Sequence, residues 1–180
     1  MTRAAAMAHT GPERAEALTR EEFELFYNRT APALRSYIRR LAGNAALADE
    51  FLQESYVRLL TAPPLADAPR KSYLYRTATN LVTDHRRSQG RQRHWWQLTA
   101  PRAEAQSAPV EFSSDIDRLF QTLAGRERAL LWLAYVAGEG HREIAEILGL
   151  KESSVKVLLY RARRKMEAIL TSHGFGGSHD

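Results

Sequence analysis

The sequence of 180 residues contains no cysteine, which excludes disulfide bonds, thiol catalysis and zinc sites built on cysteine. No apolar run approaches the roughly 20 residues that span a bilayer, and the N-terminus lacks a signal-peptide core. The six histidines are scattered, without the spacing of metal ligands. No nucleophile–base pairing and no glycine-rich phosphate loop occurs. We therefore expect a cytoplasmic protein that is not an enzyme, has no small-molecule substrate, binds no metal or cofactor, and does not insert into a membrane.

Positive charge is concentrated in two segments of a chain whose formal net charge is +5. Residues 70–93 hold seven Lys or Arg against one acid, Asp84, which gives that segment a net charge of +6. Residues 151–165 hold six against Glu152, which gives +5. The rest of the chain is therefore acidic. Two separated basic surfaces predict a polyanion that is contacted at two places.

The second basic segment has the pattern of a helix-turn-helix. A short helix carries Ile144, Ala145 and Leu148 on one face, and Gly149 follows as its stop. A longer helix comes next, for which Ser153 or Ser154 is a suitable N-cap. Its apolar positions are Val155, Leu158, Leu159, Ala162, Met166 and Ile169. A short helix, a tight turn and a longer basic helix fit the DNA major groove; the alternative is a three-helix core with a solvated charged face.

Helical periodicity recurs along the chain and no strand-like alternation appears, so we predict an all-α protein of two small helical domains joined by a flexible linker. Residues 21–96 form the first domain, in which Pro32 would kink or restart the first helix and a third helix covers about residues 72–88. Residues 115–170 form the second domain and end in the helix-turn-helix.

The remaining segments lack helical periodicity. We predict that residues 1–20 form a flexible N-terminal arm and that residues 171–180 form a flexible tail. Residues 97–114 are rich in Ala, Pro and Ser, a composition that cannot bury a core and predicts a linker. Fully extended at ~3.3 Å per residue, this linker would reach about 60 Å, which would let the two basic modules sit far apart on one long ligand.

The two domains resemble, in order, the second and fourth conserved regions of extracytoplasmic-function (group IV) sigma factors of the sigma-70 family. The acidic helix of the second region is similar to ALADEFLQESYVRLL, and the promoter-melting helix after it is similar to YLYRTATNLVTDHRR. The fourth region is similar to LAGRERALLWLAYVAGEGHREIAEILGLKESSVKVLLYRARRKM. The resemblance covers about residues 21–170. It implies an alternative sigma factor that binds RNA polymerase core, recognises −35 and −10 promoter elements, and is held by a cognate anti-sigma factor.

The resemblance implies that core polymerase is contacted through its clamp helices and its flap. The contact with the clamp helices falls on a polar surface of the second helix, whose members are Asp49, Gln53, Glu54 and Arg58. A face of carboxylates and an amide suits Arg-rich partner helices. The alternative is an ordinary solvated helix face.

The same resemblance places recognition and opening of the −10 element on the third helix. Asn80 stands where an amide can reach a base flipped from the stack, and arginines nearby would hold phosphates. Tyr75 is a weaker candidate for base stacking. Trp95 and Trp96 either stack on exposed bases or pack as a satellite core, and we favour the core. The residues assigned to −10 DNA are Tyr75, Arg76, Asn80, Asp84, Arg86, Arg87 and Arg91.

Recognition of the −35 element is implied for the basic helix of the helix-turn-helix. The family commonly has Gly-Thr where this chain has Ser153-Ser154, and Ser-Arg where it has Val157-Leu158. Val157 would therefore offer methyl groups to a thymine methyl. A −35 element of the GAAC type follows from the resemblance alone. The residues assigned to −35 DNA are Ser153, Ser154, Lys156, Val157, Tyr160, Arg161 and Arg164.

Two other kinds of protein compete with this interpretation. A classical regulator would join a helix-turn-helix to a sensor domain, but residues 21–96 show no pattern of a ligand pocket. A sigma-like decoy would sequester an anti-sigma factor without binding DNA, but both basic helices keep their arginines. The promoter-specificity subunit therefore remains the leading hypothesis.

Overall fold

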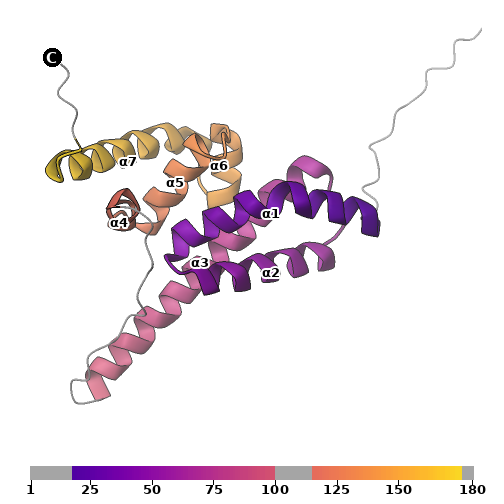
Figure 1. Ribbon diagram of the computed structural model, residues 1–180, viewed down its shortest axis with the longest axis horizontal. Helices are drawn as coiled ribbons and strands as arrows, with labels where there is room; N and C mark the ends of the chain where they lie inside the picture. Colours follow the sequence, from indigo (N-terminus) through magenta and orange to yellow (C-terminus); the bar gives the residue numbers. More distant parts are fainter. Residues whose placement is uncertain (1–17, 100–114, 176–180) are drawn as a thin grey trace, which may run out of the picture.

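The computed structural model describes the backbone of residues 18–99 and 115–175, and the side chains of the same ranges except residues 67–68 and 91–99. These ranges hold seven helices and no strand, which confirms the all-α prediction for the part described (Figure 1). No helix in these ranges combines the length and apolar character needed to cross a membrane.

Helix α1 (Arg20–Ala42) is defined at both ends by local chemistry. At its start, the hydroxyl of Thr19 accepts from the backbone N–H of Glu22, and the carboxylate of Glu22 accepts from the backbone N–H of Thr19. At its end, Gly43 adopts a left-handed conformation with φ 74°. The helix continues through Pro32, so the predicted restart there does not occur. The predicted arm of residues 1–20 is also too long, because Thr19 and Arg20 already belong to this helix start, while residues 1–17 lie outside the described residues.

Helices α2 (Ala45–Thr61) and α3 (Asp67–Thr99) complete the N-terminal half. Asn44 caps α2 by accepting from the backbone N–H of Leu47 at 3.2 Å. Two hydroxyl pairs join α1 to these helices. Thr30 of α1 pairs with Tyr56 of α2 at 2.6 Å, and Tyr37 of α1 pairs with Thr79 of α3 at 2.7 Å. These pairs satisfy polar groups within a largely apolar contact.

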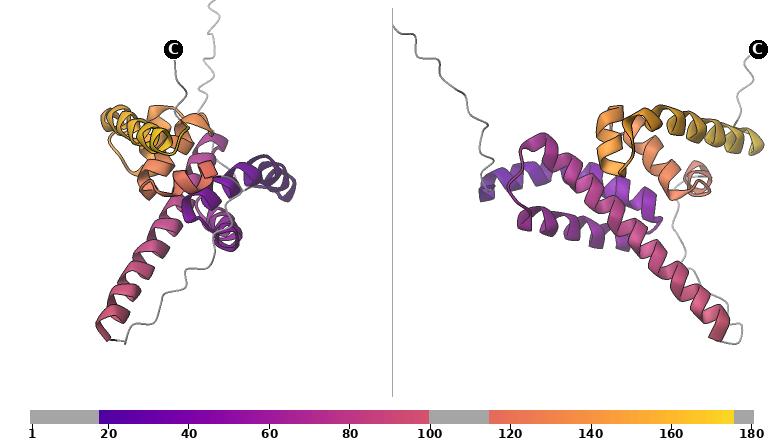
Figure 2. Two further views of the ribbon diagram at one scale, coloured as in Figure 1. Left: turned by 60° about the vertical axis from the view of Figure 1, so that its left-hand side comes forward. Right: turned by 180° about the vertical axis from the view of Figure 1, so that it is seen from behind.

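Helix α3 is longer than the sequence predicts. It includes the first three residues assigned to the linker, and its last turns extend away from the rest of the molecule (Figures 1 and 2). The predicted linker otherwise falls on residues 100–114, outside the described residues, as do the side chains of Trp95 and Trp96.

The C-terminal half consists of α4 (Asp115–Gln121), α5 (Gly125–Tyr135), α6 (His141–Leu148) and α7 (Glu152–Ser172). Gly149, with φ 62°, joins α6 to α7 and confirms the predicted turn of a helix-turn-helix. The predicted cap is wrong, because the N-cap position of α7 is Lys151, and Ser153 and Ser154 already lie in the first turn. Helix α7 also includes the first two residues of the predicted tail, and residues 176–180 lie outside the described ranges.

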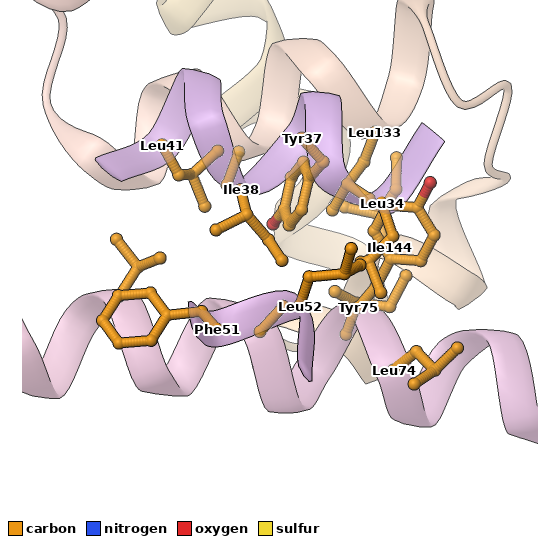
Figure 3. Close-up of a cluster of buried hydrophobic side chains, with 14 of the residues drawn as sticks. Leu34, Tyr37, Ile38, Leu41, Phe51, Leu52, Leu74, Tyr75, Leu133 and Ile144 are labelled. Atoms are coloured by element: carbon orange, nitrogen blue, oxygen red, sulfur yellow. The ribbon is translucent and has the colours of Figure 1, made fainter. Parts of the chain in front are cut away.

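The two halves share one hydrophobic core. Helix α6 packs on α3 and α5 packs on α1, whereas α2 lies on the far side of the N-terminal half (Figures 1 and 2). Leu133 and Ile144 from the C-terminal half meet Leu34, Tyr37 and Tyr75 from the N-terminal half (Figure 3). The sequence allowed the basic modules to sit far apart, but the structure holds them together.

Candidate nucleic-acid and protein interface

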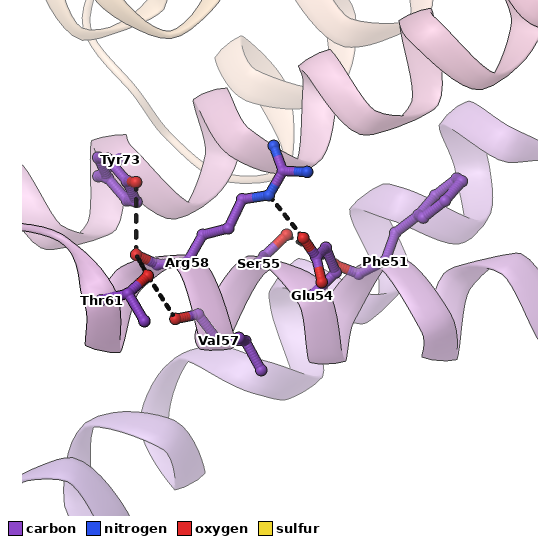
Figure 4. A network of polar contacts seen from close by, with 7 residues as sticks. All are labelled: Phe51, Glu54, Ser55, Val57, Arg58, Thr61 and Tyr73. Carbon is purple, nitrogen blue, oxygen red and sulfur yellow. Dashed lines mark hydrogen bonds and ion pairs between the residues drawn. The ribbon is translucent and has the colours of Figure 1, made fainter.

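The polar surface of α2 is exposed, and part of it is already paired within the chain. Arg35 on α1 donates two hydrogen bonds to the carboxylate of Asp49, at 2.5 and 2.9 Å. These hydrogen bonds, together with the positive charge of Arg35, hold the pKa of Asp49 below its ordinary value. Arg58 donates to Glu54 at 2.7 Å, while its backbone carbonyl accepts from the hydroxyl of Tyr73 (Figure 4). Internal pairing therefore orients three of the four predicted polymerase contacts.

Two exposed apolar side chains accompany the polar residues of α2. Val57 is 49% exposed and Leu60 is 55% exposed. Val57 lies four residues after Gln53, so these two side chains are neighbours on the helix surface. The sequence analysis missed this apolar component. The sequence did contain a signal for it, because Val57 and Leu60 do not follow the helical period of the buried positions Phe51, Ser55, Tyr56 and Leu59.

On α3, the predicted −10 residues with described side chains are exposed, except for Tyr75. Arg76, Asn80, Asp84 and Arg87 are exposed. Arg76 lies over the Tyr73 ring at 5.8 Å, and Arg87 faces Asp84 at 3.7 Å. The prediction for Tyr75 is wrong: its side chain is only 2% exposed and packs against the Tyr37 ring, so it cannot stack on a base.

Arg86, predicted as a phosphate contact, is exposed and also has a partner within the chain. Its guanidinium donates to the carbonyl of Leu41 at the C-terminal end of α1, and desolvation lowers its pKa. Arg128, which is buried, donates in the same way to the carbonyl of Gln121 at the end of α4. Burial, and then the charge of Arg86, lowers the pKa of Arg128 to about 10. Two cations thus stabilise the C-terminal ends of α1 and α4. Arg91 belongs to α3, but its side chain lies outside the described residues.

A cavity of about 630 Å³ lies between α3 and the α5–α6 pair. Asn80, Asp84 and Arg87 line it from α3, and Arg126 and Leu148 line it from the C-terminal half. Three residues of the predicted −10 stripe therefore border this cavity while remaining exposed, and Arg76 does not line it.

Helix α7 presents the predicted −35 residues on its outer surface. Val157 is 50% exposed and Tyr160 is 54% exposed, whereas Val155, Leu159 and Ala162 are buried on the opposite side. A shallow depression beside them includes Ser153, Ser154, Val157 and Arg161. Lys156 is exposed as well, and Arg164 pairs with Glu167 at 2.9 Å.

Arg126 is a residue of this surface that the sequence analysis missed. It lies in the first turn of α5 and lines the same depression as Ser154 and Arg161. It also lines the cavity beside Asn80. Sequence position gives little signal for this placement, because Arg126 precedes the recognition helix by more than one helix. The described residues include no cluster of three or more His, Asp or Glu side chains arranged to hold a metal ion.

Comparisons with known proteins give a family match for each half of the chain. Residues 26–92 match the family Sigma-70 region 2, and residues 113–166 match the family Sigma-70, region 4. The ECF RNA polymerase sigma factor SigL of Mycobacterium tuberculosis is 30% identical over 156 residues, which cover 82% of this chain and 88% of SigL. The ferric citrate uptake sigma factor FecI of Escherichia coli is 26% identical over 159 residues, which cover 83% of this chain and 91% of FecI.

Solved structures share the fold. Sigma factor RpoE in complex with the anti-sigma factor NepR from Bartonella quintana has a TM-score of 0.66 and 18% identity, covering 84% of this chain and 98% of RpoE. CnrH in complex with the cytosolic domain of CnrY has a TM-score of 0.63 and 20% identity, covering 86% of this chain and 90% of CnrH.

Two conserved sigma regions thus occur in order on one all-helical framework, and together they define a transcription initiation factor. The chain belongs to the sigma-70 family, in its extracytoplasmic-function group, and is an alternative sigma factor that directs promoter-specific transcription. Such factors act with RNA polymerase and are not catalysts in themselves.

Proposed function

We propose that α2 of this sigma factor binds the clamp helices of RNA polymerase core. Its exposed surface combines the Glu54–Arg58 pair with Gln53, Val57 and Leu60. Carboxylates oriented by fixed partners suit arginines on a partner helix, and the apolar side chains add area that loses water on contact. The C-terminal half would contact the polymerase flap.

Recognition of the −35 element is assigned to α7. The observation that carries this assignment is the exposed row formed by Ser153, Val157 and Arg161, at spacings that place them on one helix face. A helix with such a face enters the major groove, where Val157 can touch a thymine methyl and Arg161 can reach a base edge or phosphate. Lys156, Tyr160 and Arg164 lie at the edges of this face, and Arg126 beside it would bind a phosphate.

Opening of the −10 element is assigned to α3. The exposed amide of Asn80 would hydrogen-bond to a base that leaves the stack, and Arg76, Arg87 and Arg91 would hold the phosphates around it. The protein itself catalyses no reaction in this scheme. It acts in the cytoplasm and is controlled by an anti-sigma factor; the similar sigma factor RpoE was solved in complex with the anti-sigma factor NepR.

Transcription in vitro tests the proposal. The full chain is added to bacterial core polymerase on a pool of genomic promoter fragments, and start sites are mapped by sequencing. We expect new start sites that share one −35/−10 pair. Arg161→Ala should reduce transcription from them by about tenfold, because it removes one groove contact worth roughly 1–3 kcal/mol.

A matched control lies on the same helix. Arg163 is exposed but points away from the Val157–Arg161 face, so Arg163→Ala should leave start-site choice unchanged. Binding of duplex DNA by the free chain, with no redirected initiation in any sample, would instead support a classical regulator. A chain that binds no duplex DNA and gives core polymerase no new promoter would support a decoy.

A further inference from the structure

Two guanidinium groups converge on Gly125, the first residue of α5. Arg86 donates through Nη2 to the carbonyl of Leu41, while its Nη1 lies toward Gly125. Arg128 donates through Nη1 to the carbonyl of Gln121 at 3.1 Å, while its Nη2 lies toward Gly125. A Cβ on Gly125 would be 3.3 Å from Nη1 of Arg86 and 3.8 Å from Nη2 of Arg128. Each guanidinium is therefore anchored by one nitrogen and offers another to the same small space.

The donors that reach this space have no acceptor. Within the described residues, nothing accepts from Nη1 of Arg86 or Nη2 of Arg128. Arg128 is 2% exposed, and its Nε is buried without a hydrogen-bond partner as well. Burial and then the charge of Arg86 lower the pKa of Arg128, so the two cations repel each other. An anion between them would satisfy the donors and offset the repulsion.

The backbone at the start of α5 adds further donors. Ala124 holds the N-cap position and has no side-chain oxygen for the first turn. The carboxylate of Glu127 accepts from the backbone N–H of Ala124 at 2.8 Å and is also bound by Lys165. In the part of the chain that the structure describes, no group accepts from the backbone N–H of Gly125 or Arg126. First-turn N–H groups and the helix dipole both favour an anion.

These donors border the cavity of about 630 Å³ beside α3. Arg87 and Arg126 line it too, and Asp84 is the one acidic residue in the part of its wall that the structure describes. Ile147 and Leu148 give the wall an apolar component. Small-molecule sites occupy roughly 300–1,000 Å³ and combine apolar walls with a few charged groups. The cavity therefore has the size and composition of a site for a small anion with an apolar part.

We propose that this cavity binds a small phosphorylated molecule of the nucleoside diphosphate class, with one phosphate group at Gly125. The phosphate oxygens would accept from Arg86, from Arg128 and from the first-turn N–H groups of α5. A phosphate suits this place better than a carboxylate, because it has three acceptor oxygens for donors that arrive from different helices. The apolar wall would cover the nucleoside. Binding needs neither promoter DNA nor polymerase, so it is measured on the free chain.

Isothermal titration calorimetry of the full chain with ADP tests the site. Adenosine and inorganic pyrophosphate serve as the two parts of the probe. We expect one ADP bound per chain, weaker binding of pyrophosphate, and no saturable binding of adenosine, because the unpaired donors face the phosphate. Absence of saturable ADP binding would overturn the proposal, as would equal binding of ADP and adenosine.

Two variants of the site separate shape from charge. Gly125→Val fills the space between the guanidiniums without changing the charge, and Gly125 is not among the glycines with positive φ, so the helix accepts a side chain there. Arg126→Gln removes one cation from the wall. Each should weaken ADP binding by about tenfold or more, the usual effect of losing a charge-assisted contact. Melting temperatures without ligand check that both variants keep the fold.

The charge control is Arg142→Gln. Arg142 is an exposed cation on α6 that does not line the cavity and pairs with Glu146 at 3.5 Å. This variant should bind ADP as the wild type does. An equal loss of affinity in the Arg126→Gln and Arg142→Gln variants would indicate diffuse attraction by positive charge and would overturn the site.

A phosphate of nucleic acid could use the same donors, and a fluorescent single-stranded DNA oligomer distinguishes the two sources. Gly125→Val should weaken ADP binding and leave affinity for the oligomer unchanged. Loss of oligomer affinity in that variant, with no ADP binding by the wild type, would assign the site to the DNA backbone and overturn the assignment to a small molecule. Transcription by the wild type is a separate measurement, so failure of the proposed function would be seen independently.

Discussion

The guanidinium of Arg35 on α1 holds the carboxylate of Asp49 on α2 through two hydrogen bonds. Because these bonds lower the pKa of Asp49, the stabilisation that the pair gives is present above the ordinary carboxyl pKa of 3.8. It is lost as the pH falls through the lowered pKa. Arg35→Gln should therefore raise the pKa of Asp49 toward its ordinary value, as measured by carbon-13 NMR titration. An unchanged titration would contradict the pairing.

Asn80→Ala should impair promoter opening more than binding of the closed duplex. The amide can hydrogen-bond only to a base that has left the stack, so its removal weakens the open complex selectively. Permanganate reactivity of unpaired thymines measures opening, and gel-shift assays of the holoenzyme measure closed-complex binding. We expect a loss of about tenfold in opening, since one hydrogen bond to a base edge is worth roughly 1–3 kcal/mol. Equal losses in both steps would remove the base-capture role.

Val57→Asp should weaken binding to core polymerase by about tenfold or more, because it places a charge in the apolar part of the α2 surface. Its side chain is 49% exposed, so the substitution should leave the fold intact. Affinity for labelled core is measured by anisotropy. Affinity of the same variant for −35 duplex is the control, and loss of both would indicate misfolding rather than a lost polymerase contact.

Gly149→Ala should destabilise the protein by roughly 1–2 kcal/mol, the cost of a left-handed conformation for a residue with a Cβ. No atom obstructs a Cβ at this position, so backbone strain alone sets the effect. Gly90→Ala is the matched comparison, because Gly90 lies in the helical backbone of α3 with equally open surroundings. That variant should be more stable than the wild type by roughly 0.5–1 kcal/mol. Urea denaturation measures both, and changes of the same sign would contradict this account.

Ile144→Ala should lower the free energy of unfolding by about 2–5 kcal/mol, because it leaves a cavity in the core that joins the two halves. Ile144 is 0% exposed, whereas Ile116 in α4 is 49% exposed. Ile116→Ala should therefore change stability by less than about 0.5 kcal/mol. Similar losses at the two positions would show that the α3–α6 contact contributes little.

The local sequence pattern predicted the helices well, but it predicted poorly which residues contact one another across helices. The stop at Gly149 and the buried stripe of Val155, Leu159 and Ala162 follow from helical period and glycine geometry, so both were recognisable in the sequence. The sequence pattern could not decide whether Tyr73 or Tyr75 is buried. The tertiary packing of α3 against α1 decides which ring is buried. The contact between Lys71 and Glu139 joins residues far apart in the chain, which no periodicity reveals. The roles of the site residues on DNA and polymerase stay predictions.

The hydrophobic core that α3 shares with α6 also bears on how affinity for polymerase should be interpreted. If binding to polymerase core separates these helices, the chain exchanges an intramolecular interface for an intermolecular one. Its measured dissociation constant then equals the intrinsic constant divided by the open fraction. Substitutions that loosen the α3–α6 contact would therefore strengthen apparent binding to core while weakening the fold. Under that exchange, tight assembly with polymerase and a stable free protein would place opposite demands on the same side chains.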